Sequence, residues 1–190
     1  ILLVMLSAAY TIGLEWKRNT QLVLYRISGN SPLTALMGKL LPQTLVFWLI
    51  YILYAVYFYR YLQYPCNSGI MAMIGVGMLT VLGAQGFAAF LFGVCGQMRL
   101  SMCLCSLWGI LSFSLAGFTY PVTAMAPILQ KLSVLFPLRH YYLLYVNQAL
   151  NGYSITYAWH SVLALAIFAL LPLITLHHYR SLFTKVKYIP

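Results

Sequence analysis

The sequence predicts an all-α polytopic membrane protein, because of its composition and the spacing of its charges. Of its 190 residues, 63% are hydrophobic and 6% are charged, and the mean hydropathy is +0.86. In soluble domains about a quarter of the residues are charged. A transmembrane helix needs about 20 mostly apolar residues. Runs without Asp, Glu, Lys or Arg cover residues 40–59, 61–98, 100–130 and 140–179. The charges therefore separate apolar segments that are long enough to span a bilayer.

We expect a single transmembrane domain over residues 1–190 with about five spans, of which the first is truncated. The spans are expected at residues 1–14, 40–59, 70–96, 102–118 and 159–176. Residues 1–14 are too few to cross a bilayer, and they lack the basic start and cleavage site of a signal peptide. We therefore expect the sequence to be the carboxy-terminal part of a longer protein.

The basic residues predict which connections face the cytoplasm. Four of them lie in residues 15–39, one in the turn 97–101 and three in the tail 177–190, against three on the opposite side. Cytoplasmic connections carry an excess of Lys and Arg, so the first set is expected in the cytoplasm. The net charge of +10 does not indicate nucleic-acid binding, because the basic residues lie at the ends of apolar runs and not on one face.

The connection 15–39 is expected to contain a short helix. Thr20 can cap a helical segment "QLVLYRI", which Ser28 and Gly29 end, and Ser31 with Pro32 then starts the next span. A helix of about two turns cannot cross the membrane. It can dock into a partner, or it can lie in the interface as a passive anchor.

Small residues in the third span predict close helix packing. Gly86, Ala89, Gly93 and Gly96 follow steps of three, four and three residues, which places them on one helical face. Such faces let the backbones of membrane helices approach closely. We expect this face to pack against another span.

The chain lacks the residues that most catalytic sites need. Its one carboxylate is Glu15, which excludes paired-acid catalysis, and its cysteines have no metal-site spacing. No enzyme activity, cofactor site or metal site is therefore expected. Polar groups within membrane spans usually face a cavity or a neighbouring helix. Six uncharged polar residues are candidates for a translocation path or for hydrogen bonds between helices: Gln43, Thr44, Thr80, Gln85, Ser112 and Ser114.

The order of these parts resembles the permease of type-2 ATP-binding-cassette exporters, in the multidrug-type branch of bacteria. The resemblance rests on "EWKRNTQLVLYRISGNSPLTALMGKLLP" (residues 15–42), on Gln85 and Gly86, and on "GFTYPVTAMAPILQKLSVLFPLRHY" (residues 117–141). Lys17 and Asn19 depart from the acid and the glycine that are usual there. The resemblance implies a multi-pass protein of the bacterial inner membrane that works with a second permease copy or a homologous half. ATP and magnesium are then expected on a separate ATPase subunit.

The resemblance also implies that the short helix couples the spans to the ATPase. Leu24 and Tyr25 are expected to contact a groove on the ATPase, and Arg26 to reach acidic groups at its rim. Glu15 lies three residues before Arg18, a spacing that allows an ion pair on one helical face, although charge balance at the interface is an alternative role. The expected coupling residues are Glu15, Arg18, Thr20, Leu22, Leu24, Tyr25 and Arg26.

Residues 119–158 are expected to form an extracytoplasmic re-entrant helical hairpin and then an interfacial helix. Pro121 should break the fourth span, Pro127 should start the descending half of the hairpin, and Pro137 should end the next segment. A complete crossing here would place Lys131 near mid-bilayer, at a cost of about 2.5–3.5 kcal/mol. The expected outer-gate residues are Gly117, Pro121, Pro127, Lys131, Pro137 and Arg139.

The function that we expect is export of a lipophilic or amphiphilic substrate from the cytoplasm, driven by ATP hydrolysis on the partner subunit. The alternative is a non-transporting membrane scaffold or assembly factor, because the same helices can serve either class. A membrane enzyme is the third class, and the single carboxylate argues against it.

Overall fold

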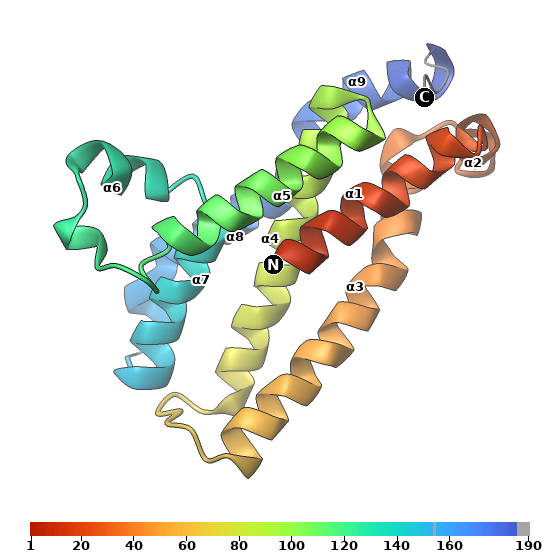
Figure 1. The fold of residues 1–190 in the computed structure, drawn as a ribbon. Helices are drawn as coiled ribbons and strands as arrows, with labels where there is room; N and C mark the ends of the chain where they lie inside the picture. Colours follow the sequence, from red (N-terminus) through yellow and green to blue (C-terminus); the bar gives the residue numbers. More distant parts are fainter. Residues whose placement is uncertain (154, 186–190) are drawn as a thin grey trace.

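The computed structural model describes residues 1–153 and 155–185, and this part of the chain contains helices and no strand (Figure 1). The α-helices are α1 (Leu2–Lys17), α2 (Gln21–Ile27), α3 (Pro32–Val56), α4 (Ile70–Cys95), α5 (Met98–Leu115), α6 (Pro127–Ser133), α7 (Pro137–Tyr145), α8 (Trp159–Leu170) and α9 (Pro172–Lys185). Two π-helical turns, η1 (Tyr57–Tyr61) and η3 (Val146–Leu150), follow α3 and α7, and two 3-10 turns, η2 (Val122–Ala124) and η4 (Ile155–Ala158), lie in the connections.

Four helical segments of the described residues are long and apolar enough to cross a membrane. They are Pro32–Tyr61, Ile70–Cys95, Met98–Leu115 and Thr156–Phe183. The helix α1 has 16 residues, and it corresponds to the span that was expected to be truncated. The prediction of an all-α polytopic membrane protein is therefore confirmed.

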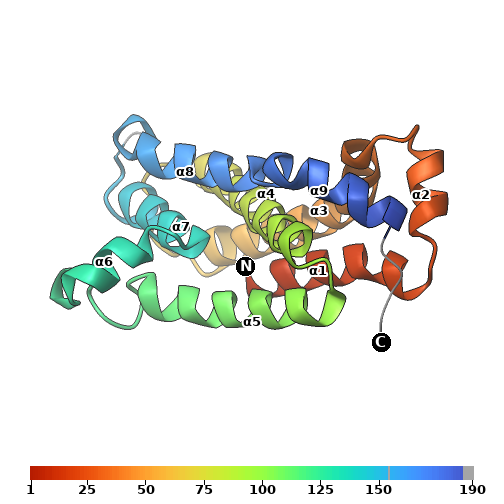
Figure 2. The same ribbon diagram turned by 90° about the horizontal axis from the view of Figure 1, so that it is seen from above.

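The helix α4 lies at the centre of the bundle and is the most buried of the four segments (Figure 2). Its glycines allow this position, because a Cβ atom at Gly86 would lie 2.5 Å from the carbonyl oxygen of Phe168 in α8. A Cβ atom at Gly93 would lie 2.7 Å from Oγ1 of Thr175 in α9. The small-residue face of the third span thus packs directly on α8 and α9, as the sequence predicts.

The last span consists of two consecutive helices and extends beyond residue 176. The helix α9 begins at Pro172 and continues to Lys185, so the first part of the expected tail 177–190 is helical. Residues 186–190 lie outside the described residues. At its start, α9 follows α8 with a break at Leu171, because proline removes one backbone donor and blocks the preceding helical turn.

The proline-rich segment after α5 differs in detail from the sequence prediction. Pro121 does not end the fourth span, because α5 already ends at Leu115 and Gly117 has a φ of +102°, a left-handed conformation that suits glycine. Pro137 does not end a helix either; it occupies the first turn of α7, where proline needs no hydrogen-bond partner. Pro127 starts α6, which lies outside the bundle beside the end of α5 (Figure 1).

Replacing Gly86 by Ala tests the close packing of α4. The added methyl would meet the backbone of Phe168 and Ala169, so one helix must shift, and we expect a loss of stability of about 1–3 kcal/mol. The matched control is Gly75→Ala in the same helix, where nothing lies within 4 Å of the new Cβ. Reversible unfolding in mixed micelles measures both variants, and equal stability of the two would contradict the packing.

Candidate functional site

An aromatic cluster fixes α2 to three spans. The Tyr25 ring stacks on Phe183 of α9, with 5.6 Å between the ring centroids. Phe183 also contacts Trp16 of α1 at 4.9 Å, and Trp16 contacts Phe92 of α4 at 5.1 Å. All four of these side chains are at most 7% exposed. Aromatic pairs add about 0.5–1.5 kcal/mol each to the burial of their area, so α2 is held firmly.

The single carboxylate makes a second connection at the same place. Glu15, near the end of α1, forms an ion pair with Lys39 of α3 and accepts a hydrogen bond from the hydroxyl of Thr20. Thr20 is the residue that precedes α2. One side chain therefore joins α1, the start of α2 and α3. We call Glu15, Thr20 and Lys39 the polar clamp.

The predicted pairing of Glu15 with Arg18 is replaced by the pairing with Lys39. Arg18 is exposed at the end of α1, where an ion pair three residues along a helix adds only about 0.2–0.5 kcal/mol. Lys39 reaches Glu15 from another helix at a position where the carboxylate side chain is 12% exposed. Water screens that contact less than a surface pair. No pattern within one helix could predict it, because the partner comes from a different element.

The polar clamp also sets the protonation of Glu15. Burial by itself raises the pKa of this carboxyl group. The hydrogen bonds from Lys39 and Thr20, together with the positive charges of Lys39 and Arg18, outweigh burial and hold the pKa below its usual value. Glu15 is therefore ionised at neutral pH, and the clamp keeps its charge.

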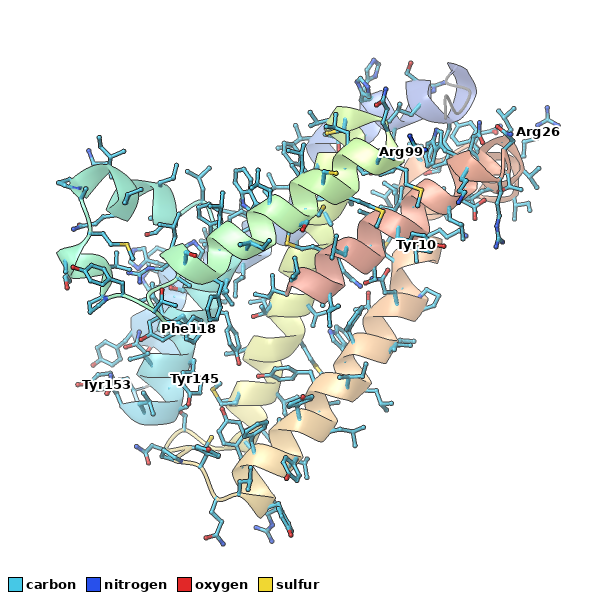
Figure 3. All side chains as sticks on the ribbon, in the orientation of Figure 1. Tyr10, Arg26, Arg99, Phe118, Tyr145 and Tyr153 are labelled. Carbon is cyan, nitrogen blue, oxygen red and sulfur yellow. The ribbon has the colours of Figure 1, made fainter. Side chains whose placement is uncertain are left out.

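The outward surface of α2 differs from the one that the sequence predicts. Tyr25 is 7% exposed and Leu24 packs partly against the same cluster, so neither lies on the outer face. Leu22, Val23 and Ile27 are 45%, 57% and 80% exposed. With Arg26, which lies at the outer edge of the molecule in Figure 3, these residues form the free face of α2.

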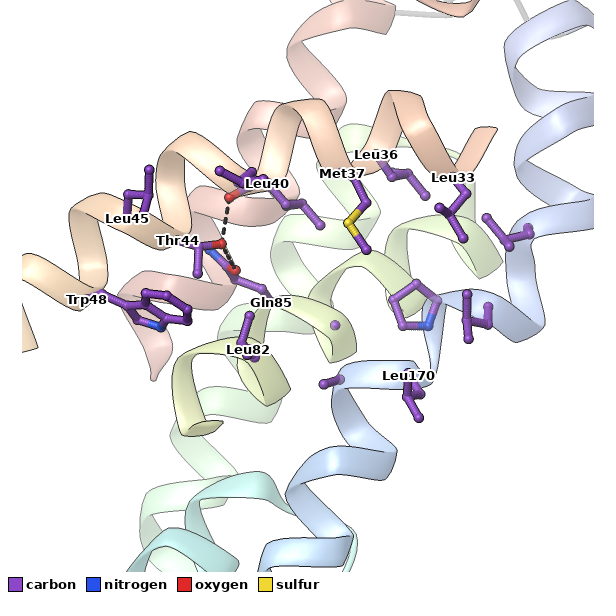
Figure 4. A pocket seen from close by; sticks show the side chains of 16 residues that line it. Leu33, Leu36, Met37, Leu40, Thr44, Leu45, Trp48, Leu82, Gln85 and Leu170 are labelled. Carbon is purple, nitrogen blue, oxygen red and sulfur yellow. Dashed lines mark hydrogen bonds between the residues drawn. The ribbon is translucent and has the colours of Figure 1, made fainter. Parts of the chain in front are cut away.

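Two of the six polar candidates meet at a pocket between the spans. The Thr44 hydroxyl donates to Oε1 of Gln85, 2.6 Å away, and lies 2.8 Å from the carbonyl oxygen of Leu40 (Figure 4). The pocket has a volume of ≈ 550 Å³ and is otherwise lined mainly by apolar side chains of α3, α4, α8 and α9. Leu41 and Leu45 in its wall are each 54% exposed. The pair is thus a polar point in an apolar groove.

The other four candidates do not join this pocket. Gln43 faces α1, where its Oε1 accepts a hydrogen bond from Thr11 at 3.1 Å. The Thr80 hydroxyl donates to the carbonyl oxygen of Val76 in its own helix. Ser112 is buried in α5 and Ser114 is exposed. Hydrogen bonding within and between helices accounts for Gln43 and Thr80.

The candidate gate residues lie where α5 ends and α7 begins. Nη1 of Arg139 donates to the carbonyl oxygen of Ala116 at 3.0 Å, and the rings of Phe118 and Tyr142 lie 4.4 Å apart. Arg139 therefore satisfies a carbonyl group that the end of α5 leaves free. Pro127 and Lys131 of α6 are exposed, and so is Pro121, which precedes η2. Pro137 is buried and Gly117 is partly exposed.

The comparison with protein families finds one match that covers most of the chain. The family model described as ABC-2 family transporter protein matches residues 1–176. This range includes α2, the polar clamp, the pocket at Thr44 and Gln85, and the segment from α5 to α7. Among curated proteins and among solved structures, no significant match is found.

Replacing Glu15 by Gln tests the polar clamp. At neutral pH we expect a loss of stability of about 1–3 kcal/mol, because the partners lose a charged acceptor. Since folding lowers the pKa of Glu15, its contribution is complete above the unfolded value of about 4.3 and falls as the pH drops through the folded value. The difference between parent and variant should therefore shrink below about pH 4.

The matched control for the clamp is Lys17→Gln, which removes an exposed charge from the same end of α1. It should change stability by less than about 0.5 kcal/mol. Denaturant unfolding of the purified protein between pH 3 and pH 8 gives both quantities. A Glu15→Gln variant as stable as its parent at pH 7 would show that the clamp does not support the fold.

Proposed function

Because this chain belongs to the ABC-2 family of transporter proteins, we propose that it is the permease subunit of an ATP-driven exporter. Members of the family are membrane components of transporters, and they work with an ATP-binding-cassette subunit. The chain is accordingly a multi-pass membrane protein. We propose further that it moves a lipophilic or amphiphilic substrate out of the cytoplasm. The proposed location is the inner membrane of a bacterium, as a pair with a second copy or a homologous half.

The attachment of α2 carries this proposal. The polar clamp and the aromatic cluster tie the helix to α1, α3 and α9, and through Trp16 of α1 to α4, by contacts of different kinds. Close-packed interiors are not compressible at the scale of such contacts. A displacement of α2 must therefore displace the ends of the spans. A passive interfacial anchor needs no such connection to four helices.

The free face of α2 is the proposed contact with the ATPase. Leu22, Val23 and Ile27 offer apolar side chains, and Arg26 adds a guanidinium group beside them. An amphipathic helix of this kind binds a hydrophobic groove through its apolar face. ATP and magnesium belong to the partner subunit in this proposal. In this proposal Tyr25 transmits the displacement of α2 inward through its contact with Phe183.

The segment from α5 to α7 is the proposed outer gate and re-entrant hairpin. Several polar groups there hold short helices together: His140 Nε2 lies 2.9 Å from the carbonyl oxygen of Val134, and Gln130 donates to that of Met125 at 2.8 Å. Backbone outside regular helices is tolerated at membrane depth only where protein or a cavity covers it. The proposed path runs between the two permease copies, with Thr44 and Gln85 as a polar contact for the substrate.

Cysteine labelling tests the proposed orientation. In a background without native cysteines, Gln63→Cys and Tyr153→Cys should react with a membrane-impermeant thiol reagent added outside intact cells. Ser181→Cys should react only after the membrane is opened. The expectation follows from the excess of basic residues on the α2 side. Reaction of Ser181→Cys from outside would reverse the topology.

Truncation of the free face tests coupling. The double variant Val23→Ala and Ile27→Ala removes five carbons that are about half buried in the proposed contact, or about 2 kcal/mol at about 0.8 kcal/mol per buried methylene. We expect about 30-fold weaker binding of the ATPase subunit and a matching loss of export and of substrate-stimulated ATP hydrolysis. Co-purification and transport into inverted vesicles measure these effects.

The matched control for coupling is Val46→Ala with Leu49→Ala, two exposed apolar residues of α3 that do not line the pocket at Thr44. This variant also removes five carbons, and it should insert, bind the ATPase and export as the parent does. A Val23 and Ile27 variant that binds its ATPase and exports at the parent rate would refute the coupling role. Failure of the parent protein to bind any ATPase would instead favour a scaffold.

A further inference from the structure

A second pocket lies at the end of the molecule opposite α2, between the carboxyl end of α3 and the helix α7. Its volume is ≈ 430 Å³, and seven of its eight lining residues are aromatic. The lining residues are Tyr51, Tyr54, Ala55, Phe58, Tyr59, Tyr64, Tyr141 and Tyr145. We call this site the tyrosine pocket. Six of the 16 tyrosines of the chain gather there, although they come from three separate parts of the sequence.

The inner wall of the tyrosine pocket is anchored to the central helix. The hydroxyl of Tyr51 donates to the carbonyl oxygen of Met73 in α4 at 3.1 Å. The ring of Tyr51 occupies the space in which Gly77 lacks a side chain, since a Cβ atom there would lie 1.9 Å from the ring. The neighbours of this ring thus fix its rotamer, so the ring does not rotate freely as an exposed side chain does.

The outer wall is held by stacked rings and by a fastened loop. Phe58 stacks on Tyr54 at 5.6 Å and contacts Tyr64 at 5.6 Å. The loop beyond Tyr64 is tied to η3, because Asn67 Nδ2 donates to the carbonyl oxygen of Leu150 at 2.7 Å. The hydroxyl of Ser68 donates to the carbonyl oxygen of Gln148. These contacts fix the positions of the rings, so the pocket is open before a ligand binds.

Membrane anchoring does not account for the inner rings of this arrangement, although Tyr54 and Tyr64 in the lining are 61% and 51% exposed. Tyrosines are enriched where proteins meet the membrane interface, and Tyr57 and Tyr61, which are 52% and 77% exposed, are consistent with that role. Tyr51, Tyr141 and Tyr145 differ, since they are only partly exposed and line the pocket. An anchoring residue contacts lipid, whereas these three rings face protein and an open volume.

The chemistry of the lining points to a positively charged guest. Aromatic faces carry partial negative charge and attract alkylammonium groups, and rings that surround such a group bind it without a carboxylate. The one carboxylate of the chain, Glu15, is held by Lys39 at the α2 end of the molecule, whereas Tyr145 lies at the other end (Figure 3). An acidic side chain of this chain therefore cannot supply the counter-charge in the pocket.

An adjoining pocket suits an apolar chain attached to that guest. It has a volume of ≈ 320 Å³ and shares Tyr51, Tyr54 and Tyr141 with the tyrosine pocket. Its other walls include Phe47 and Leu138, and it continues toward the middle of the bundle along α3 and α4. A molecule with a cationic head and an apolar tail could place each part in a lining of matching chemistry.

We propose that the tyrosine pocket binds the alkylammonium head group of an amphiphile, whose apolar chain lies in the adjoining pocket. The head group can belong to a choline lipid of the surrounding bilayer or to a cationic molecule that the protein transports, and its chemistry is the same in both. Binding requires no ATP hydrolysis, so the test below is independent of the proposed export function.

The test uses two fluorescent probes that differ only in charge. One carries a dansyl group, a six-carbon chain and a trimethylammonium head, and the other carries a neutral tert-butyl head of the same shape. Titration into the purified protein, in nanodiscs whose lipids lack choline, gives both dissociation constants. We expect the cationic probe to bind about tenfold more tightly, a preference typical of a partly desolvated cation–π site.

Two substitutions of Tyr145 then test whether the preference for the cationic probe arises in the tyrosine pocket. Tyr145→Leu should reduce the ratio of the two dissociation constants to about 1, whereas Tyr145→Phe should preserve it, because the aromatic face does the binding. Tyr57→Leu is the matched control, since Tyr57 is exposed and does not line the pocket. Equal binding of both probes to the parent, or an unchanged ratio in Tyr145→Leu, would overturn the proposal.

A measurement on the parent protein covers the case in which Tyr145→Leu does not fold. Cys66 is partly exposed and lies two residues beyond Tyr64, which lines the tyrosine pocket, so an occupied pocket should slow the reaction of Cys66 with a thiol reagent. The exposed Cys103 in α5 serves as the internal control. The cationic probe should protect Cys66 severalfold while the neutral probe does not. Equal reaction rates with both probes would count against the site.

Two further arms identify the source of the head group once the charge preference is established. If choline lipids supply it, nanodiscs of phosphatidylcholine should weaken probe binding severalfold relative to choline-free lipids. If a transported cation supplies it, inverted vesicles should accumulate the cationic probe with ATP, and Tyr145→Leu should slow that uptake. Either result supports the site, and it assigns the pocket to lipid binding or to transport.

Discussion

The close approach of α4 to α8 and α9 is the contact on which the rest of the bundle depends. Lipid tails are as apolar as leucine side chains, so burial of apolar area does not drive membrane helices together. Dispersion contacts between closely spaced backbones hold the helices together, and such contacts need residues as small as Gly86 and Gly93. The other spans then use α4 as a common support, which explains its central and most buried position.

At the α2 end, two kinds of interaction act on the same few residues. The aromatic cluster around Trp16 and Tyr25 supplies area and shape, and the ion pair of Glu15 with Lys39 supplies direction. A charge that is largely withdrawn from water must keep its partners, because an unpaired one is costly. The start of α2 therefore cannot slide freely along the spans, although the helix has only two turns.

The opposite end of α3 shows how the same bundle can leave open space. A Cβ atom at Gly77 would meet the ring of Tyr51, whereas a Cβ atom at Gly86 would meet the backbone of α8. At Gly77 a side chain, and not a helix backbone, fills the space beside the glycine. Hydrogen bonds from Tyr51 and Asn67 then keep α3, α4 and η3 at their distances. Rigid contacts around an unfilled volume distinguish a pocket that is built into the fold from a gap between loosely packed side chains.

The sequence by itself determined the fold class and the short helix at residues 21–27, because apolar length, charge spacing and residues that end a helix, such as Gly29, act over a few turns. Only the tertiary structure decided which side chains face each other. It paired Glu15 with Lys39 instead of Arg18, turned Tyr25 inward, and gathered six tyrosines around one volume. These contacts join residues of different helices, and the rotation and depth of each helix follow from packing, which no local pattern contains.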